Sequence, residues 1–482
     1  MSKFILAIDQ GTTSSRVLVI DQETRLKEIF THDFKQIFKD DQVLQNSEEI
    51  YLGLKDILDK AINKYKKENI VAIGITNQRE TTVIFNEQGN PLDYAISWQS
   101  KHTKEICDTW SVLGYAPLIK ETTGLEINPY FSASKMVDLL NKPHIKTHLK
   151  TSKAFFGTMD TFILYKLTNG KSFFTDITNA SRTMVFDINK KVYCERLLSL
   201  FNIPKEMLAE VKSNNDYFGD YLGIPIKAMI GDQQSALFGH LCLSKGTMKV
   251  TYGTGAFILM NTGEEVYQSK SGLISTIFYD IDGITNYALE GSIFIAGASV
   301  LWLKDQLNVI NESYQSEEEA LKSNNEMYFV PAFVGLGAPY WDSDVRGAMF
   351  GITQEINKAD IIKATLNAIA YQVKDVVDVM LKEAKMPLKE VHIDGGVSKN
   401  NYLMQFQADL LRCPLVKPVE SEITGLGAAF IAGLGTFFPS LNYLKEKQQF
   451  QQTYHPLISF KEASKLYEGW KIAVNSARSY KP

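Results

Sequence analysis

The chain has 482 residues, of which 45% are hydrophobic and 22% charged, and its formal net charge is −4. A chain of this length and composition usually forms roughly two to four domains with sizeable cores. Its weakly acidic balance supplies no basic field, which argues against nucleic acid and against an anionic membrane surface as partners.

The cysteines and histidines are dispersed along the chain and form no recognisable ligand spacing. The four cysteines show no CxxC pair: Cys107, Cys194, Cys242 and Cys413. This pattern favours reduced thiols in a cytosolic enzyme over a disulfide framework or a zinc site. The chain enters a strand at Phe4, so we expect no signal peptide. The apolar segment Thr424–Phe438 is too short and Gly-rich to span a bilayer and predicts a buried helix with its turn.

Two strands are predicted at Phe4–Ile8 and Val17–Asp21, with a polar turn between them. The turn residues are Gly11, Thr12, Thr13, Ser14 and Ser15, followed by Arg16. Backbone N–H groups and hydroxyls in such a hairpin can surround a phosphate, and the arginine adds positive charge. The alternative is an ordinary hydroxyl-rich turn, because Gly-Thr-Thr is a common sequence.

Alternating elements follow, with helices near Glu48–Lys66 and Thr103–Trp110 and a strand at Val71–Thr76 between them. A further strand is predicted at Ile224–Ile230, and Gly231 lets the backbone turn before Asp232. Ligands of open α/β sheets bind at the carboxyl ends of strands, so this carboxylate suits a general base. The alternative is that Asp232 caps the helix that follows it.

The strand–turn–strand pattern returns at Met248–Tyr252, Gly253–Gly255 and Ala256–Met260. This weak internal repeat predicts two similar domains, at 1–245 and 246–482, with a nucleotide between them. No GxxxxGK[ST] motif is present, because Tyr165 stands at the first glycine position before Gly170-Lys171-Ser172, so a P-loop enzyme is disfavoured.

The second half also contains a long amphipathic helix and a third glycine turn. Apolar residues at helical spacing predict a helix over Ala359–Ala384. A strand at Val391–Asp394 leads into Gly395 and Gly396, and another helix begins near Ser398 or Asn400. The two glycines permit close approach of a nucleoside, although a tight strand-to-helix turn requires glycine just as often.

Five segments in this order resemble the glycerol kinases of the FGGY carbohydrate kinase family, and the resemblance covers nearly the whole chain. The segments are Asp9–Arg16, Asn77–Thr82, Gly231–Gln234, Thr251–Gly255 and Gly335–Gly347. Any one of them is a weak signal, whereas five in the same order are specific. The resemblance implies an α/β fold with two actin-like, ribonuclease H-like domains and a nucleotide cleft between them. It also implies ATP-dependent phosphorylation of glycerol to sn-glycerol 3-phosphate and assembly into a dimer or tetramer.

The resemblance further implies the roles of particular residues. Asp232 would be the general base, and the polyol pocket would consist of Arg79, Glu80, Trp98, Tyr130, Asp232, Gln233 and Phe257. ATP would be bound by Thr12, Thr13, Ser14, Arg16, Thr254, Gly297, Gly396 and Asn400. Asp9 and Asp232 would lie at Mg²⁺. Elsewhere an Arg-Glu neighbour pair marks a solvated edge, and such aromatic residues are more often core.

Several positions depart from the family pattern. Asp138 stands where a tryptophan is usual, Lys101-His102 replaces arginines, and Leu301 stands where many relatives have a glutamine near the nucleotide. Two alternatives remain at this point: a sister kinase for a pentulose or another polyol, and a non-catalytic actin-like nucleotide-binding protein.

Overall fold

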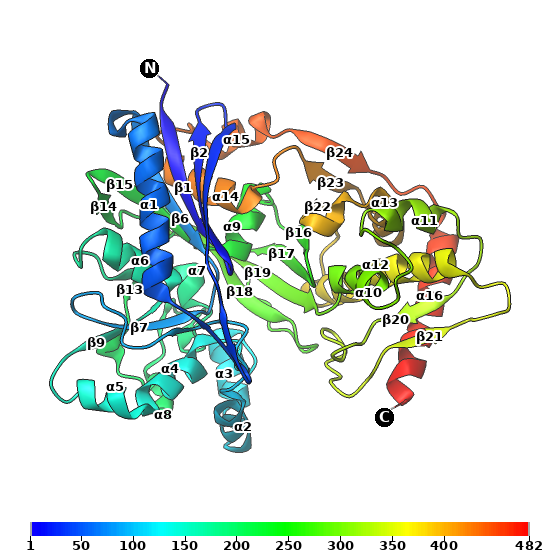
Figure 1. The fold of residues 1–482 in the computed structure, drawn as a ribbon, viewed down its shortest axis with the longest axis horizontal. Helices are drawn as coiled ribbons and strands as arrows, with labels where there is room; N and C mark the ends of the chain where they lie inside the picture. Colours follow the sequence, from blue (N-terminus) through cyan, green and yellow to red (C-terminus); the bar gives the residue numbers. More distant parts are fainter. Residues whose placement is uncertain (1, 481–482) are drawn as a thin grey trace.

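The computed structural model describes residues 2–480, and its N-terminal half is built on a six-stranded sheet (Figure 1). The strand order is β14 (Gly219–Tyr221), β15 (Ile224–Gly231), β6 (Ile70–Asn77), β1 (Phe4–Gln10), β2 (Ser14–Asp21) and β3 (Leu26–Asp33). β1 and β2 form an antiparallel hairpin, while β1, β6 and β15 run parallel. The four strands that the sequence predicts in this half are confirmed.

A second, seven-stranded sheet repeats this topology in the C-terminal half. Its order is β18 (Ile274–Ile281), β19 (Ile284–Ile293), β17 (Ala256–Gly263), β16 (Thr247–Tyr252), β22 (Glu390–Asp394), β23 (Leu415–Pro418) and β24 (Phe450–Tyr454). Here β16 and β17 form the hairpin, and β16, β22 and β23 run parallel. Both sheets end in an antiparallel edge strand, so the predicted internal repeat is present in the fold.

The N-terminal half carries a further five-stranded sheet, and helices cover the sheets. The small sheet has the order β4 (Ile37–Lys39), β5 (Gln42–Gln45), β8 (Ala95–Ile96), β7 (Thr82–Asn86) and β9 (Ala154–Thr158). The helices before β16 are α1 (Ser47–Tyr65), α2 (Lys104–Val112), α3 (Ala116–Thr123), α4 (Ser132–Asn141), α5 (Pro143–His148), α6 (Met159–Leu167), α7 (Ile177–Ala180), α8 (Glu195–Phe201) and α9 (Asp232–Gly239). Those after it are α10 (Gly297–Asp305), α11 (Gln315–Leu321), α12 (Lys358–Ala384), α13 (Asn401–Leu411), α14 (Ile423–Gly433), α15 (Leu441–Lys447) and α16 (Phe460–Ser479).

The long helix α12 confirms the prediction at Ala359–Ala384, with one more residue at its N-terminus. Asn357 and Asp360 form a reciprocal capping box that satisfies N–H groups of the first turn. Throughout residues 2–480, the structure has no helix with the length and apolar character needed to cross a bilayer.

Helices α9 and α14 lie between the two large sheets and hold them together (Figure 1). Helix α14 comes from the C-terminal half, yet it packs on the first sheet, where a Cβ atom at Gly74 of β6 would lie 2.5 Å from the Ala428 carbonyl oxygen. Helix α9 follows β15 and packs on the second sheet. Each half therefore contributes a helix to the other half's core.

The contact between α9 and α14 depends on Gly427, where an added Cβ would lie 1.9 Å from the Ser235 carbonyl oxygen. We expect Gly427→Ala to force the helices apart and lower the free energy of unfolding by about 1–3 kcal/mol, as overpacking does. Urea titration measures the free energy of unfolding of each variant. Gly53→Ala is the matched control, because the three atoms nearest to its Cβ all belong to a side chain, that of His32, and not to backbone. Equal stabilities of the two variants would contradict the close-packing argument.

Candidate active site

Asp232 begins helix α9 directly after β15, at the carboxyl end of a strand of the first sheet. The N-cap residue is Gly231, and Oδ1 of Asp232 accepts only from the neighbouring Gln233 N–H within this turn, at 2.7 Å. The capping alternative is therefore wrong. Burial raises the pKa of Asp232, Arg79 opposes this shift, and Glu80 adds to it. Its side chain is 28% exposed, so it remains open to a ligand.

Arg79 and Glu80 lie in a buried ring of four charges, and not at a solvated edge. Nη1 and Nη2 of Arg79 donate to Glu290 of β19 at 2.7 and 2.9 Å. Nε of Arg182, in the loop after α7, donates to Oε1 of Glu80 at 2.6 Å. Nε of Arg79 lies 3.3 Å from Oδ1 of Asp232. Arg79 Nε and Glu80 Oε1 are 3.8 Å apart, and each side chain has a closer partner.

The backbone at Glu80 is held in a strained conformation. Its φ of +62° lies in the left-handed region, which a residue with a long side chain rarely adopts. Its carbonyl oxygen accepts from Ser132 Oγ at 3.1 Å and from Lys135 Nζ at 3.3 Å. Such strain persists only where the surroundings impose it, which is typical of a ligand site.

The structure brings two of the three predicted pocket aromatics together. The rings of Trp98 and Tyr130 meet edge to face with centroids 5.6 Å apart, and the guanidinium of Arg182 lies over Tyr130. Phe257 is on β17, opposite Ser292 of β19. Side chains two residues apart on a strand share a face, so Phe257 lies on the same side of the second sheet as Glu290.

The hydroxyl hairpin lies beside these aromatics. Nε1 of Trp98 donates to Oγ1 of Thr12 at 3.1 Å, which joins the predicted polyol and phosphate residues. Thr13 and Ser14 complete the turn and are at least partly exposed. Nη1 of Arg16 binds Oε2 of Glu422 at 2.7 Å, just before α14. The hairpin therefore faces the segment of the C-terminal half that leads into α14.

Asp9 is paired with Arg16 across the β1–β2 hairpin. Burial raises the pKa of Asp9 to about 7; Asp232 and Glu422 add to the shift, and Arg16 opposes it. Two interacting carboxylates fit a Mg²⁺ ion, which usually takes one or two of them together with phosphate oxygens and water. Across residues 2–480, no three His, Cys, Asp or Glu side chains gather into a complete protein-only metal site.

Lys249 of β16 connects the second sheet to Gln233, which follows Asp232 in the chain. Its Nζ donates to Oε1 of Gln233 and, at 2.7 Å, to Oγ1 of Thr251. Burial lowers the pKa of Lys249, while the carboxylates of Asp394 and Asp232 oppose the shift. The amide oxygen of Gln233 is therefore engaged by Lys249, which leaves its NH₂ group for other partners.

The predicted nucleotide residues of the second half meet at one cavity of about 380 Å³. Thr254, Gly297, Gly396 and Asn400 all line it, and so does Leu301. Gly297 is indispensable to the turn, since a Cβ there would lie 2.7 Å from the Gly253 carbonyl oxygen. The remaining lining residues are Tyr252, Gly253, Val300, Ser313, Tyr314, Ser316, Glu317, Leu366, Val397 and Lys399. Apolar walls with a few polar groups suit a nucleoside.

Sequence reasoning missed residues that carry no local motif. Glu290 and Arg182 complete the charge ring, and residues between Ser313 and Glu317 line the 380 Å³ cavity. The available signal was the position of Glu290 inside the largely buried strand segment Ile284–Ile293, because a charge inside a buried strand requires a partner. Of the departures, Asp138 lies 3.4 Å from His102, so the two unusual residues contact each other.

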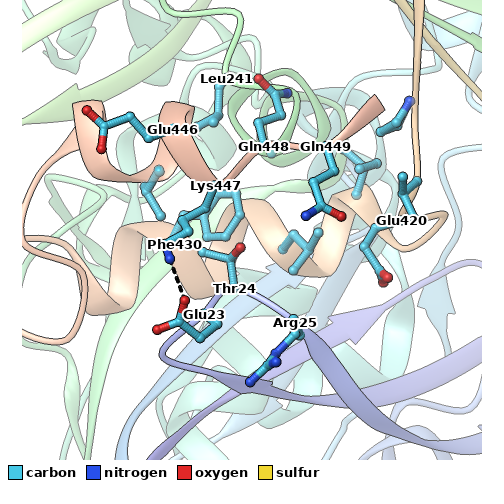
Figure 2. A pocket seen from close by; sticks show the side chains of 16 residues that line it. Glu23, Thr24, Arg25, Leu241, Glu420, Phe430, Glu446, Lys447, Gln448 and Gln449 are labelled. Carbon is cyan, nitrogen blue, oxygen red and sulfur yellow. Dashed lines mark hydrogen bonds and ion pairs between the residues drawn. The ribbon is translucent and has the colours of Figure 1, made fainter. Parts of the chain in front are cut away.

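A second cavity, of about 290 Å³, lies between the β2–β3 turn and the segments around α14 and α15 (Figure 2). Glu23 of the turn binds Lys447 of α15, and Phe430 of α14 contributes to the floor. None of the predicted site residues lines this cavity. The chemistry-bearing side chains gather instead around Asp232.

Two family models match the chain: the N-terminal domain of the FGGY family of carbohydrate kinases over residues 4–239 and its C-terminal domain over residues 248–436. The glycerol kinase of Staphylococcus haemolyticus is 42% identical over 100% of this chain and 99% of that protein. The glycerol kinase of Shewanella pealeana is 44% identical over 99% of each chain.

Solved structures agree with these sequence matches. The crystal structure of Plasmodium falciparum glycerol kinase with ADP has a TM-score of 0.94 and 35% identity, covering 99% of this chain and 98% of that one. A xylulose kinase from Lactobacillus acidophilus shares the fold, with a TM-score of 0.88, 21% identity and 98% of each chain covered. The predicted two-domain α/β fold and the predicted family are confirmed: this chain belongs to the FGGY family of carbohydrate kinases.

Proposed function

We propose that this enzyme transfers the γ-phosphate of ATP to glycerol and forms sn-glycerol 3-phosphate. The observation that carries the proposal is the assembly of the buried Arg79 and Glu80 with the partly exposed Asp232. Full-length identities of 42–44% to glycerol kinases support the same substrate. A small triol needs several fixed donors and acceptors around a thin carbon skeleton, and this assembly supplies them.

In this proposal Asp232 accepts the proton of the attacking hydroxyl. Phosphoryl transfer depends mainly on alignment and charge neutralisation, so the base must be held close to the reacting oxygen. Arg79 and Glu80 orient the hydroxyls, Trp98, Tyr130 and Phe257 cover the carbons, and the free NH₂ group of Gln233 adds a donor.

The nucleotide would lie between the two halves, which we propose to divide after residue 245. Thr12, Thr13, Ser14 and Arg16 would contact its terminal phosphates, and the 380 Å³ cavity would hold its adenosine end. Arg16 would then leave Glu422 for phosphate. Asp9 and Asp232 would hold Mg²⁺, which neutralises phosphate charge when it is bound.

We further propose a cytoplasmic enzyme that forms a dimer or tetramer. The free thiols at Cys107, Cys194, Cys242 and Cys413 support a reducing compartment. Light scattering of the purified protein tests the assembly, and a monomeric mass would contradict it.

A panel of coupled assays that follow ADP release tests the substrate. We expect glycerol to give a kcat/KM at least about tenfold above those of dihydroxyacetone, xylulose and erythritol, because a site that binds substrate hydroxyls rejects poor matches. A best rate with xylulose would favour the pentulose alternative. Nucleotide binding without turnover of any of the four would favour the non-catalytic alternative.

Cleft closure is a further expected result. The site takes Asp232 from the first half and Lys249 from the second, so the halves must open for ligand exchange and close to exclude water. Small-angle scattering should show a smaller radius of gyration when glycerol and a nonhydrolysable ATP analogue are added together. An unchanged radius, with binding of both ligands verified by calorimetry, would count against closure.

A further inference from the structure

Glu290 is the only member of the four-charge ring that the second sheet contributes, since Arg79, Glu80 and Arg182 all precede it in the N-terminal half. Its Oε2 accepts from Arg79 Nη1 at 2.7 Å, and its Oε1 accepts from Arg79 Nη2 at 2.9 Å and from Arg182 Nη2 at 3.2 Å. Two parallel bonds of this kind fix the plane of a guanidinium as well as its position.

The ring is fully removed from water. The side chains of Arg79, Glu80, Arg182 and Glu290 are all 3% exposed or less. Burial alone would raise the pKa of Glu290, but Arg182 and Arg79 outweigh it and hold the pKa at about 2. Glu290 is therefore charged at neutral pH, and its charge is matched by the two arginines.

A ring that served packing alone would be expected to satisfy its own hydrogen bonds. This one does not, because Nη1 of Arg182 is buried without a partner among residues 2–480. The same ring also reaches reactive groups: Nε of Arg79 lies 3.3 Å from Asp232, and Nε of Arg182 binds the carboxylate of Glu80 at 2.6 Å. Glu290 thus contacts, through one arginine each, both acidic residues of the proposed polyol pocket.

We propose that Glu290 is a positioning residue for the polyol: it holds Arg79 and Arg182 from the opposite half, and through them orients Asp232 and Glu80. The polyol site is then complete only while the two halves are docked through this carboxylate. This inference rests on the proposed function, but it concerns whichever polyol the enzyme phosphorylates.

The test compares Glu290→Gln with wild type, using the polyol that wild type turns over best in the substrate panel. The glutamine keeps the shape of the glutamate side chain. It loses the negative charge and one of the two oxygens that accept hydrogen bonds from Arg79. We expect the KM for that polyol to rise about tenfold or more, as loss of a charged hydrogen bond does. The KM for ATP should stay within about threefold, since the nucleotide cavity contains no ring residue.

Asp280→Asn is the matched control. Asp280 is also a buried carboxylate facing the N-terminal half from the neighbouring strand β18, where it lies 3.5 Å from Lys191 and accepts from Ser213. It contacts no residue of the proposed site, so its variant should lose stability with an unchanged KM. A Glu290→Gln variant that behaves in the same way would overturn the proposal, because its role would then be structural.

A background variant separates positioning from a general loss of packing. Arg79→Lys replaces the fork with a point charge that cannot form both bonds. Because Glu290 acts partly through Arg79, adding Glu290→Gln to this background should raise the polyol KM by a smaller factor than it does in wild type, where Arg182 and Arg79 are both affected. If Glu290→Gln raised the polyol KM by the same factor in the Arg79→Lys background as in wild type, the proposal would be contradicted.

If Glu290→Gln does not fold, Glu290→Asp is measured instead. This variant keeps the negative charge and shortens the side chain. A polyol KM raised at least about threefold with an unchanged KM for ATP would support positioning, and an unchanged polyol KM would overturn it. Failure of the proposed function gives a different result, namely a wild type that prefers a substrate other than glycerol.

Discussion

Asp232→Asn is expected to lower kcat at least about 100-fold, the usual minimum for removal of a general base. The amide keeps the size of the side chain but cannot accept a proton as the new bond forms. Calorimetry should still detect glycerol and nucleotide, because proton acceptance is needed only in the transition state. Turnover above about a tenth of wild type would rule out a base role.

The pH profile provides a second check on Asp232. A base must be ionised, and burial raises the pKa of this carboxyl above its ordinary value of 3.8. Activity should therefore fall as the pH drops through the raised pKa, so the acidic limb of kcat lies above pH 3.8. An acidic limb of kcat at or below pH 3.8 would mean that ionisation of Asp232 does not limit the rate.

Arg79→Ala is expected to have the largest effect on stability. It removes both bonds to Glu290 and leaves a buried carboxylate with one arginine, a change that typically costs about 3–5 kcal/mol. It should also raise the KM for glycerol far more than that for ATP. Thermal unfolding and steady-state kinetics measure the two effects.

The control for this variant is Arg25→Ala. Arg25 binds Asp21 at 2.8 Å, but its side chain is 66% exposed, and such surface pairs contribute about 0–1 kcal/mol. An unchanged KM for glycerol in Arg79→Ala would show that Arg79 lies outside the pocket. If Arg79→Ala lowered the stability no more than Arg25→Ala does, burial of the Arg79–Glu290 pair would contribute little to stability.

The sequence by itself determined the local elements. Apolar periodicity predicted β1, β2, β6, β15, β16 and β17 and the long helix α12, because strand and helix periods depend only on near neighbours. Glycine and hydroxyl residues likewise marked the hairpin turns and the position of Asp232 at a strand end. The repeated strand–turn–strand pattern was enough to predict two similar halves.

Only the tertiary structure decided which distant residues meet. Arg79 and Glu290 are 211 positions apart, and Arg16 and Glu422 are 406 apart. No local period encodes such pairs, since they join residues of the two halves that meet only in the folded chain. Burial was also decided at this level: Arg79 and Glu80 have the sequence of a solvated edge, but the second sheet closes over them and supplies the carboxylate that makes their burial possible.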